Sequence, residues 1–184
     1  MIRFIFVILI CFLFSSCQKI ENDFFVYKIK EGKHRSVTRY ETIKSDELKF
    51  VAIFNSSAIY ESKDPVNQLD INKLYGFSDC NSHHQKNSAR FGWRWNNNSL
   101  EILAYVYNDG ERKYQFITTV PLDTEVNYSL KITDDSYQFF VDNSYVIMDR
   151  TSNCDVGFHY LLYPYFGGDE PAPHDISISI RDSH

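Results

Sequence analysis

Residues 89–119 read ARFGWRWNNNSLEILAYVYNDGERKYQFITT, three runs rich in aromatic and aliphatic side chains that are separated by NNN and NDG. Runs of this length and composition are typical of β-strands. Asn, Asp and Gly tolerate the positive φ angles that tight hairpins require. The stretch therefore predicts a meander of antiparallel hairpins, and the same pattern continues to residue 148.

Short runs of the same kind recur on both sides of this stretch, and amphipathic helical periodicity is nearly absent. The expected strands are residues 24–30, 48–54, 89–95, 100–107, 112–119, 127–133, 137–141, 145–148, 158–165 and 175–181. So many short strands in one domain imply two packed sheets, because one open sheet would leave an apolar face uncovered. The sequence therefore predicts an all-β fold over residues 24–184, a two-sheet antiparallel β-sandwich of the jelly-roll kind.

Residues 55–88 are the one region with weak strand character, since they are long and polar. Long structured loops in compact domains are often functional. We therefore expect a loop here. It is either functional or a surface crossover between the two sheets.

Charge and composition narrow the range of partners. The chain has 184 residues and a formal net charge of -5, which argues against nucleic-acid binding because that requires a basic face. Aromatic residues make up 16% of the chain. They suit strands and sandwich cores, and some could instead line a ligand platform.

The chain begins MIRFIFVILICFLFSSCQK, in which Arg3 precedes an apolar stretch at residues 4–14. That stretch is too short to span a bilayer as a helix and is typical of a signal peptide. Two serines followed by Cys17 resemble the lipobox of bacterial lipoproteins, in which the cysteine is acylated. The resemblance implies a leader at residues 1–16 and a lipidated tether at residues 17–23. An ordinary signal peptide with an unrelated cysteine is the alternative.

A lipid on Cys17 would anchor the protein to a membrane, because each buried methylene contributes about 0.8 kcal/mol. The expected location is then the bacterial cell envelope, most simply the outer membrane, facing either the periplasm or the cell surface. The residues after Cys17 leave the membrane face undecided. Oligomeric state is likewise left open.

Two cysteines, Cys80 and Cys154, lie downstream of Cys17, whereas Cys11 is lost with the leader. An even pair outside the cytoplasm favours a disulfide. The bridge would close a long loop and stabilise the fold by about 4 kcal/mol on the chain-entropy model. Two free buried thiols are the alternative.

Three stretches, residues 67–95, 100–112 and 160–180, resemble a group of uncharacterised lipoproteins and secreted proteins from Gram-negative bacteria. That group is similar to the concanavalin A-like lectin and glucanase jelly rolls. The resemblance implies the same sandwich over most of the mature chain. It does not imply one activity, since the superfamily contains lectins, glucanases and polysaccharide lyases.

Catalytic residues of the glucanase type are not evident. Retaining glucanases of this fold carry paired carboxylates on one strand, which must face one sugar. Here Glu101 stands alone, and the residue two positions later is Leu103. A lyase needs a base and a group that neutralises the uronate, and six residues could supply these roles: His83, His84, Arg90, Arg94, Tyr105 and Tyr107.

A binding surface is the favoured interpretation. Strand alternation puts Glu101, Tyr105 and Tyr107 on one face, which offers rings for sugar C–H faces and a polar group for hydroxyls. The full candidate set for ligand binding is His83, His84, Asn87, Arg90, Arg94, Glu101, Tyr105 and Tyr107. Trp93 and Trp95 are assigned to the core, with a place on the ligand platform as the alternative. The sequence thus favours a non-catalytic carbohydrate-binding or adhesion module, with a lyase, a glycoside hydrolase or a protein-interaction module as alternatives.

Metal sites are weakly indicated. His83 and His84 are adjacent and would point opposite ways in an extended chain, so they cannot easily share one zinc ion. Many sandwiches of the resembled superfamily hold a structural calcium ion with an aspartate on the final strand. Asp175 has a comparable place, although it and His174 could simply satisfy loop amides. No other cofactor is expected.

Overall fold

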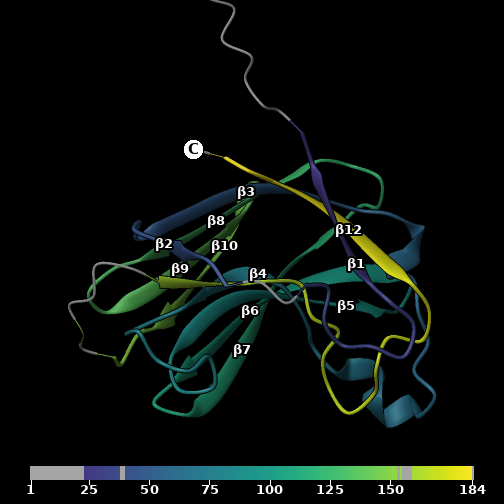
Figure 1. Ribbon diagram of the computed structural model, residues 1–184, viewed down its shortest axis with the longest axis horizontal. Coiled ribbons are helices and arrows are strands. Elements are labelled where there is room, and N and C mark those ends of the chain that lie inside the picture. The colour runs from purple at the N-terminus through teal and green to yellow at the C-terminus, as the bar shows by residue number, and fades with distance from the viewer. Residues whose placement is uncertain (1–22, 38–39, 153, 155–158, 184) are drawn as a thin grey trace, which may run out of the picture.

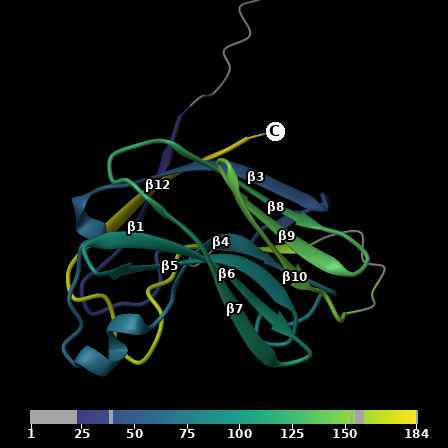
Figure 2. The same ribbon diagram turned by 180° about the vertical axis from the view of Figure 1, so that it is seen from behind.

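The protein is a sandwich of two six-stranded antiparallel sheets (Figures 1 and 2). The computed structural model describes residues 23–37, 40–152, 154 and 159–183. The first sheet contains, in spatial order, β1 (Phe25–Ile29), β12 (Ile176–Asp182), β3 (Glu47–Phe54), β8 (Val126–Ile132), β9 (Ser136–Val141) and β10 (Ser144–Asp149). The second sheet contains β2 (Thr42–Ile43), β11 (His159–Leu162), β4 (Asn72–Ser78), β5 (Ser88–Asn96), β6 (Ser99–Asn108) and β7 (Glu111–Val120).

The predicted all-β sandwich is confirmed, and most predicted strands agree with the observed ones to within one or two residues. The described residues also form two 3-10 helices, η1 (Ser56–Ala58) and η2 (Pro65–Leu69). None of the helices in the described part of the chain is long and apolar enough to cross a membrane.

The expected hairpins are present in both sheets. Strands β5, β6 and β7 form one meander, and β8, β9 and β10 form another in the opposite sheet. Asn97 and Asn98 have φ angles of 48° and 55°, and Asp109 and Gly110 have 49° and 90°. These left-handed conformations allow the tight turns that bring β5, β6 and β7 into register.

Strand β4 corrects the expectation of a loop at residues 55–88. It lies between β11 and β5, and its side chains are almost all buried. Leu74, Tyr75 and Phe77 are each 0% exposed and supply its contribution to the core. Polar residues on both sides of this short run concealed it in the sequence, whereas packing between two neighbouring strands stabilises it.

The predicted strand at residues 158–165 is shorter than expected. Residue 158 lies outside the described residues, and β11 ends at Leu162. Pro164 follows, which has no N–H for a sheet hydrogen bond. Tyr165 then makes isolated bridges to Arg35 and Lys73.

Most of the large aromatic side chains pack between the sheets. Phe91 and Trp93 on β5 are 0% exposed, as expected, and Trp95 is partly buried against the same core. The Trp93 ring contacts the rings of Phe54 and Tyr60 at centroid distances of 5.3 and 5.9 Å. Alternation along β5 therefore directs Arg90 and Arg94 to the outer face of the second sheet.

Candidate functional site

The outer face of the second sheet carries two adjoining cavities of about 660 and 220 Å³, which we call the groove. Both cavities are lined by His84, Gln85, Arg90 and Tyr165. The residues that give the groove its chemistry are Arg35, Lys73, His83, His84, Arg90, Tyr105, Tyr107, Arg112 and Tyr165. They come from β4, β5, β6, β7, the loop after β4 and two irregular segments.

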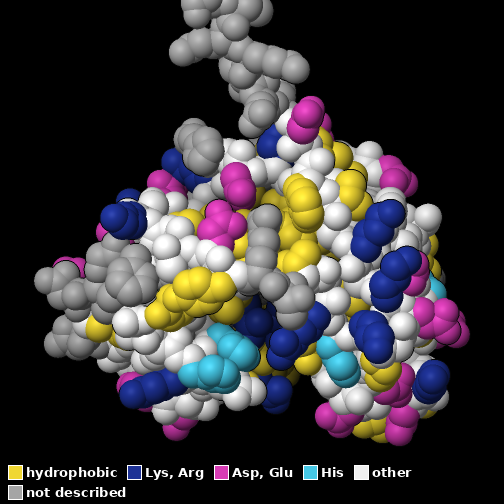
Figure 3. Space-filling model, viewed as in Figure 1, with side chains coloured by type: hydrophobic (Ala, Val, Ile, Leu, Met, Phe, Trp, Pro, Cys, Tyr) yellow, Lys and Arg dark blue, Asp and Glu magenta, His cyan; other side chains and the backbone are white. Residues whose placement is uncertain are grey.

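The groove is positively charged although the chain has a net charge of -5. Among the residues that the structure describes, four Lys or Arg side chains line it and no Asp or Glu does. Figure 3 shows Lys and Arg side chains gathered in a hollow at the centre of this face, with His side chains beside them. The potential inside the groove therefore favours an anion.

Arg90 on β5 is the most unusual residue of the groove. It is only 7% exposed, and its Nε has no hydrogen-bond partner among the described residues. No ion pair of its guanidinium occurs within the same part of the chain. Burial lowers the pKa of Arg90 to about 10, which still leaves the side chain charged at neutral pH.

A glycine and a bulge make room for Arg90. The register of β4 shifts between Lys73 and Gly76. A Cβ atom on Gly76 would lie 2.6 Å from the Arg90 Cα and 2.9 Å from its Cγ, which is closer than real Cβ atoms come. The bulge and the missing side chain therefore let β5 and Arg90 approach β4 closely.

The Tyr105 ring lies close to two cations. The Lys73 ammonium is 4.8 Å from the centre of its ring, and the Arg90 guanidinium carbon is 5.5 Å from it. Burial, followed by the charges of Arg90 and Arg112, lowers the pKa of Lys73 to about 8. Burial and the neighbouring Tyr107 raise the pKa of Tyr105 to about 12.

Lys73 is fixed by backbone pairing to Tyr165, whose ring also lines the groove. The Lys73 N–H donates to the Tyr165 carbonyl at 2.8 Å, and the Tyr165 N–H donates back at 2.9 Å. The Lys73 Nζ donates to the Ile71 carbonyl at 2.7 Å. The amine therefore has a defined position at the base of the smaller cavity.

His83 and His84 lie together at the groove, which corrects the expectation that they point opposite ways. Their loop turns, with the Lys86 N–H donating to the His83 carbonyl at 2.8 Å, and the two ring centroids are 4.2 Å apart. Burial, Arg90 and His83 lower the pKa of His84 to about 4. His84 is therefore a neutral imidazole at pH 7, and its unprotonated ring nitrogen can accept a hydrogen bond or, as a weak base, a proton.

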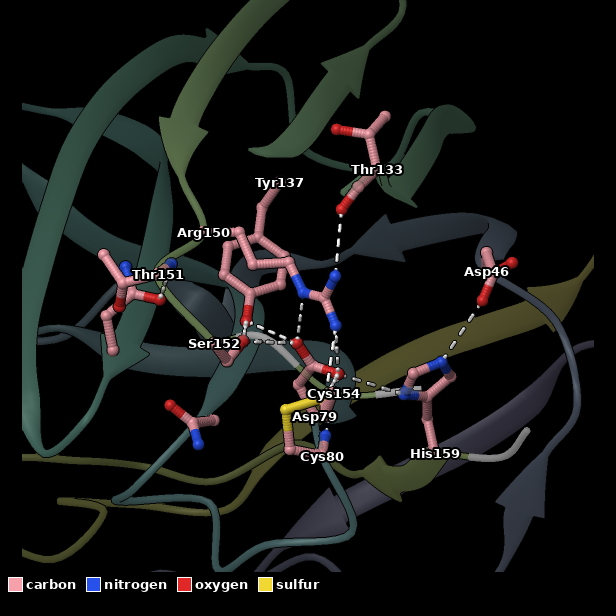
Figure 4. Close-up of polar contacts among 12 residues, drawn as sticks. Asp46, Asp79, Cys80, Thr133, Tyr137, Arg150, Thr151, Ser152, Cys154 and His159 are labelled. Carbon is pink, nitrogen blue, oxygen red and sulfur yellow. Dashed lines mark hydrogen bonds and ion pairs between the residues drawn. A yellow bond between two sulfur atoms is a disulfide. The ribbon is translucent and has the colours of Figure 1, made fainter. Parts of the chain in front are cut away.

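A buried carboxylate anchors the start of this loop (Figure 4). Asp79 is 0% exposed and accepts hydrogen bonds from Arg150 Nε at 2.6 Å, the Tyr137 hydroxyl at 2.7 Å and the Cys80 N–H at 2.7 Å. Burial raises the pKa of Asp79, but the bonds from Arg150 and Tyr137 outweigh it and hold the pKa below its ordinary value.

The expected disulfide joins Cys80 and Cys154 beside this carboxylate, with the Cα atoms 5.5 Å apart. It links the loop after β4 to the segment after β10, and so connects the two sheets. With Asp79 it fixes the point from which the loop carrying His83 and His84 departs.

Three predicted ligand residues lie outside the groove. Arg94 Nε donates to Glu101 Oε2 at 2.6 Å, and Asn96 donates to the other carboxylate oxygen at 2.9 Å. Glu101 shares a face with Tyr105 and Tyr107, as expected, but it is neutralised by Arg94. Asn87 is 3% exposed and accepts from the Asp109 N–H at 2.9 Å, so it braces two turns.

Four residues of the groove were missed from the sequence: Arg35, Lys73, Arg112 and Tyr165. Arg112 could have been found, because the NDG hairpin pairs it with Tyr107. Lys73 stood in the region expected to be a loop. Arg35 and Tyr165 come together through an isolated bridge between distant segments, which has no sequence signal.

Both carboxylate oxygens of Asp175 accept a hydrogen bond. One carboxylate oxygen accepts from Lys30 Nζ at 2.6 Å, and the other accepts from the Glu31 N–H at 2.9 Å. Calcium requires six to eight oxygen ligands. In the described part of the chain, the only group of three metal-binding side chains is Asp79 with the disulfide pair Cys80 and Cys154. A calcium ion at Asp175 stays a prediction.

Comparison with known proteins identifies the fold. No protein-family model and no curated protein matches the chain. Alginate lyase AlyC3 aligns with a TM-score of 0.57 at 10% identity, over 86% of this chain and 72% of that one. The same lyase in complex with dimannuronate gives 0.53 at 11% identity, over 85% and 71%.

A second enzyme class has the same architecture. The catalytic domain of an endo-1,3-β-glucanase (laminarinase) from Thermotoga petrophila RKU-1 aligns with a TM-score of 0.55 at 12% identity, over 89% of this chain and 81% of that one. At these identities the likeness shows the fold alone, the jelly-roll β-sandwich that the sequence predicted. Function must be argued from the groove itself.

Proposed function

We propose that this protein binds an acidic polysaccharide, built of uronate residues, in the groove on its second sheet. The observation that carries the proposal is the buried guanidinium of Arg90, which has no hydrogen bond or ion pair within the described residues. It lies at the centre of the groove, since both cavities share it.

The charge of Arg90 favours an anionic ligand over a neutral one. A largely buried charge without a counter-ion is unfavourable, because the contact with the Tyr105 ring replaces only part of the hydration that the charge has lost. A carboxylate compensates for the lost hydration, because its two oxygens form a bidentate pair with the planar guanidinium. A neutral glycan offers hydroxyl acceptors but no negative charge to balance Arg90.

The rest of the groove suits a sugar chain. Tyr105, Tyr107 and Tyr165 offer rings and hydroxyls, and rings of this kind pack against the apolar C–H faces of sugars. Structural neighbours support this choice: one is named for alginate and its complex for dimannuronate, and another for a β-glucan. Carbohydrate is thus the substrate class these neighbours share.

Binding without catalysis is the first form of the proposal. Hydrolysis of the glycosidic bond requires two carboxylates, and the described lining of the groove contains none. The second candidate is a lyase, favoured by one specific observation: the neutral imidazole of His84 lies in the same cavity as Arg90 and Tyr107. Such a set contains a base, a neutraliser for the carboxylate and a proton donor.

Calorimetric titration against paired acidic and neutral oligosaccharides tests the proposal. Oligomannuronates and oligogalacturonates are expected to bind, and β-glucan oligomers of the same length are not. Arg90→Met should abolish the binding without unfolding the protein, because within the described residues the guanidinium has no hydrogen bond or ion pair to lose, and its cation–π contact is with the Tyr105 ring. Arg181→Met, in an exposed pair with Glu125 on the first sheet, is the matched control.

The same mixtures separate the alternatives. Absorbance from unsaturated uronate products would identify a lyase, and bound but intact oligomers a binding module. Preference for neutral glucans would contradict the proposal. Absence of any sugar affinity together with capture of a dedicated envelope protein would favour an interaction module instead.

We further propose that the protein is a lipoprotein of the bacterial cell envelope, anchored through Cys17. Cys17 and the leader lie outside the described residues. The N-terminal end of the described chain lies at one side of the sandwich, whereas β6 and β7 lie at the other (Figure 1). An anchor at Cys17 is therefore compatible with a groove open to a glycan. Mass spectrometry of the mature N-terminus should find an acylated Cys17, and an unmodified protein starting elsewhere would refute the anchor.

A further inference from the structure

Two exposed aromatic side chains on β7 continue the face that carries the groove. Tyr114 is 53% exposed and Phe116 is 49% exposed. β7 is the last strand of its sheet, and its first six residues are all exposed. Large rings left in water next to a hollowed face are typical of a binding surface.

The register of the sheet sets both rings on the outer face. Tyr114 is paired with Tyr105, and Phe116 is paired with Leu103. Tyr105 lines the groove, and it forms a small apolar cluster with Leu103 outside the main core. Because paired residues on adjacent strands have Cβ atoms about 5 Å apart, the Tyr114 ring is the immediate neighbour of the groove wall.

Positive charge also extends from the groove on to β7. Arg112, which lines the smaller cavity, precedes Tyr114 by two residues on the same strand and so lies on the same face. A polyanionic chain that leaves the groove past Arg112 would next meet Tyr114 and Phe116. Flat rings in this position match the C–H face of a sugar residue.

We propose that Tyr114 and Phe116 form an outlying subsite, on which a sugar residue of the bound polysaccharide stacks beyond the groove. The inference rests on the proposed function and extends it. The ligand then extends from the groove on to the edge strand, so only oligomers long enough to reach both rings use the subsite.

A second protein chain is a poorer occupant of this edge. β7 begins with three charged residues in succession, Glu111, Arg112 and Lys113. Charged side chains on an edge strand oppose pairing with another strand. A glycan requires no backbone pairing and makes use of Arg112.

The test is calorimetric titration of the whole protein with oligomannuronates and oligogalacturonates of increasing length. The affinity of the wild-type protein should rise with length until the subsite is filled. Tyr114→Ala and Phe116→Ala should weaken binding of the long oligomers by about five- to tenfold, the scale of truncating one contributing residue of an interface. Dimers and trimers should bind to both variants with the same affinity as to the wild-type protein.

Two variants serve as controls. Tyr114→Phe keeps the ring and should bind long oligomers like the wild-type protein. Tyr145→Ala removes a ring that is 65% exposed on β10 of the opposite sheet, and should change nothing.

Other outcomes overturn the inference. Unchanged affinity of Tyr114→Ala and Phe116→Ala for long oligomers would remove the subsite while leaving the groove as proposed. A wild-type dimer, seen by light scattering, that both variants convert to monomer would identify a contact between copies instead. If the wild-type protein binds no oligomer of any length, the proposed function fails and the subsite fails with it.

Discussion

The guanidinium carbon of Arg90 lies 5.5 Å from the centre of the Tyr105 ring. The ammonium of Lys73 is 4.8 Å from the same ring. Two cations share one buried aromatic side chain, and the charge of Arg90 contributes to lowering the Lys73 pKa. Such an arrangement is unfavourable in the empty groove and favourable once an anion lies between the two charges.

Lys73 makes binding of an anion dependent on pH. Its pKa is lowered to about 8, mainly by burial and then by Arg90 and Arg112. Below that pH the amine is protonated and attracts the ligand; as the pH rises from about 8 the free protein loses the charge, so affinity falls. Titrations between about pH 7 and about pH 9 should show this decrease in the wild-type protein. Lys73→Met should bind more weakly and lack the decrease; an identical pH profile in both proteins would contradict the role of Lys73.

Tyr107 and Arg94 should behave differently, although both were candidates from the sequence. Tyr107 lines the groove, so Tyr107→Ala should weaken oligouronate binding by about 1 kcal/mol or more. Arg94 is paired with Glu101 at 2.6 Å outside the groove. Arg94→Ala should leave the affinity unchanged and lower the free energy of unfolding by about 1 kcal/mol. Equal losses of affinity in calorimetry would show that the ligand extends to Arg94.

Asp79 should be a major contributor to stability. Asp79→Asn removes the charge that pairs with the buried Arg150, and should lower the free energy of unfolding by about 3–5 kcal/mol. The folded-state pKa of Asp79 lies below its ordinary value, so its contribution is present above about pH 4 and is lost as the pH falls through the folded-state pKa.

Urea unfolding at neutral and acidic pH measures this contribution. Glu125→Gln, in the exposed pair with Arg181, is the matched control and should change stability by less than about 0.5 kcal/mol. A gap between wild-type protein and Asp79→Asn that persists undiminished in acid would contradict the electrostatic origin.

The strands of the fold could be predicted because period-two alternation and turn residues are local signals. Residues 89–119 fold into β5, β6 and β7 as expected, with Asn97, Asn98 and Asp109 in the turns. β4 was missed because its few apolar residues lie within a long polar stretch. Its stability comes from burial between two neighbouring strands, which is not a local property.

The groove could be predicted only in part. Five residues of the groove were found from alternation and residue type: His83, His84, Arg90, Tyr105 and Tyr107. Arg94 and Glu101 were wrongly included, because their pairing depends on the register across a hairpin, which residue type does not reveal. Net charge concealed the basic groove, because the acidic residues that the structure describes lie elsewhere.

The pairing of Arg90 with a ligand carboxylate is the central claim, and one set of titrations tests it directly. Wild-type protein and Arg90→Met are each titrated with an oligomannuronate and with the same oligomer after its carboxylates are reduced to alcohols. The wild-type protein should bind the acidic ligand at least about tenfold more tightly than the reduced one, the scale of a charge-assisted hydrogen bond. Arg90→Met should bind both ligands weakly and alike. If Arg90→Met distinguishes the two ligands as well as the wild-type protein does, Arg90 does not recognise the carboxylate and the account is wrong.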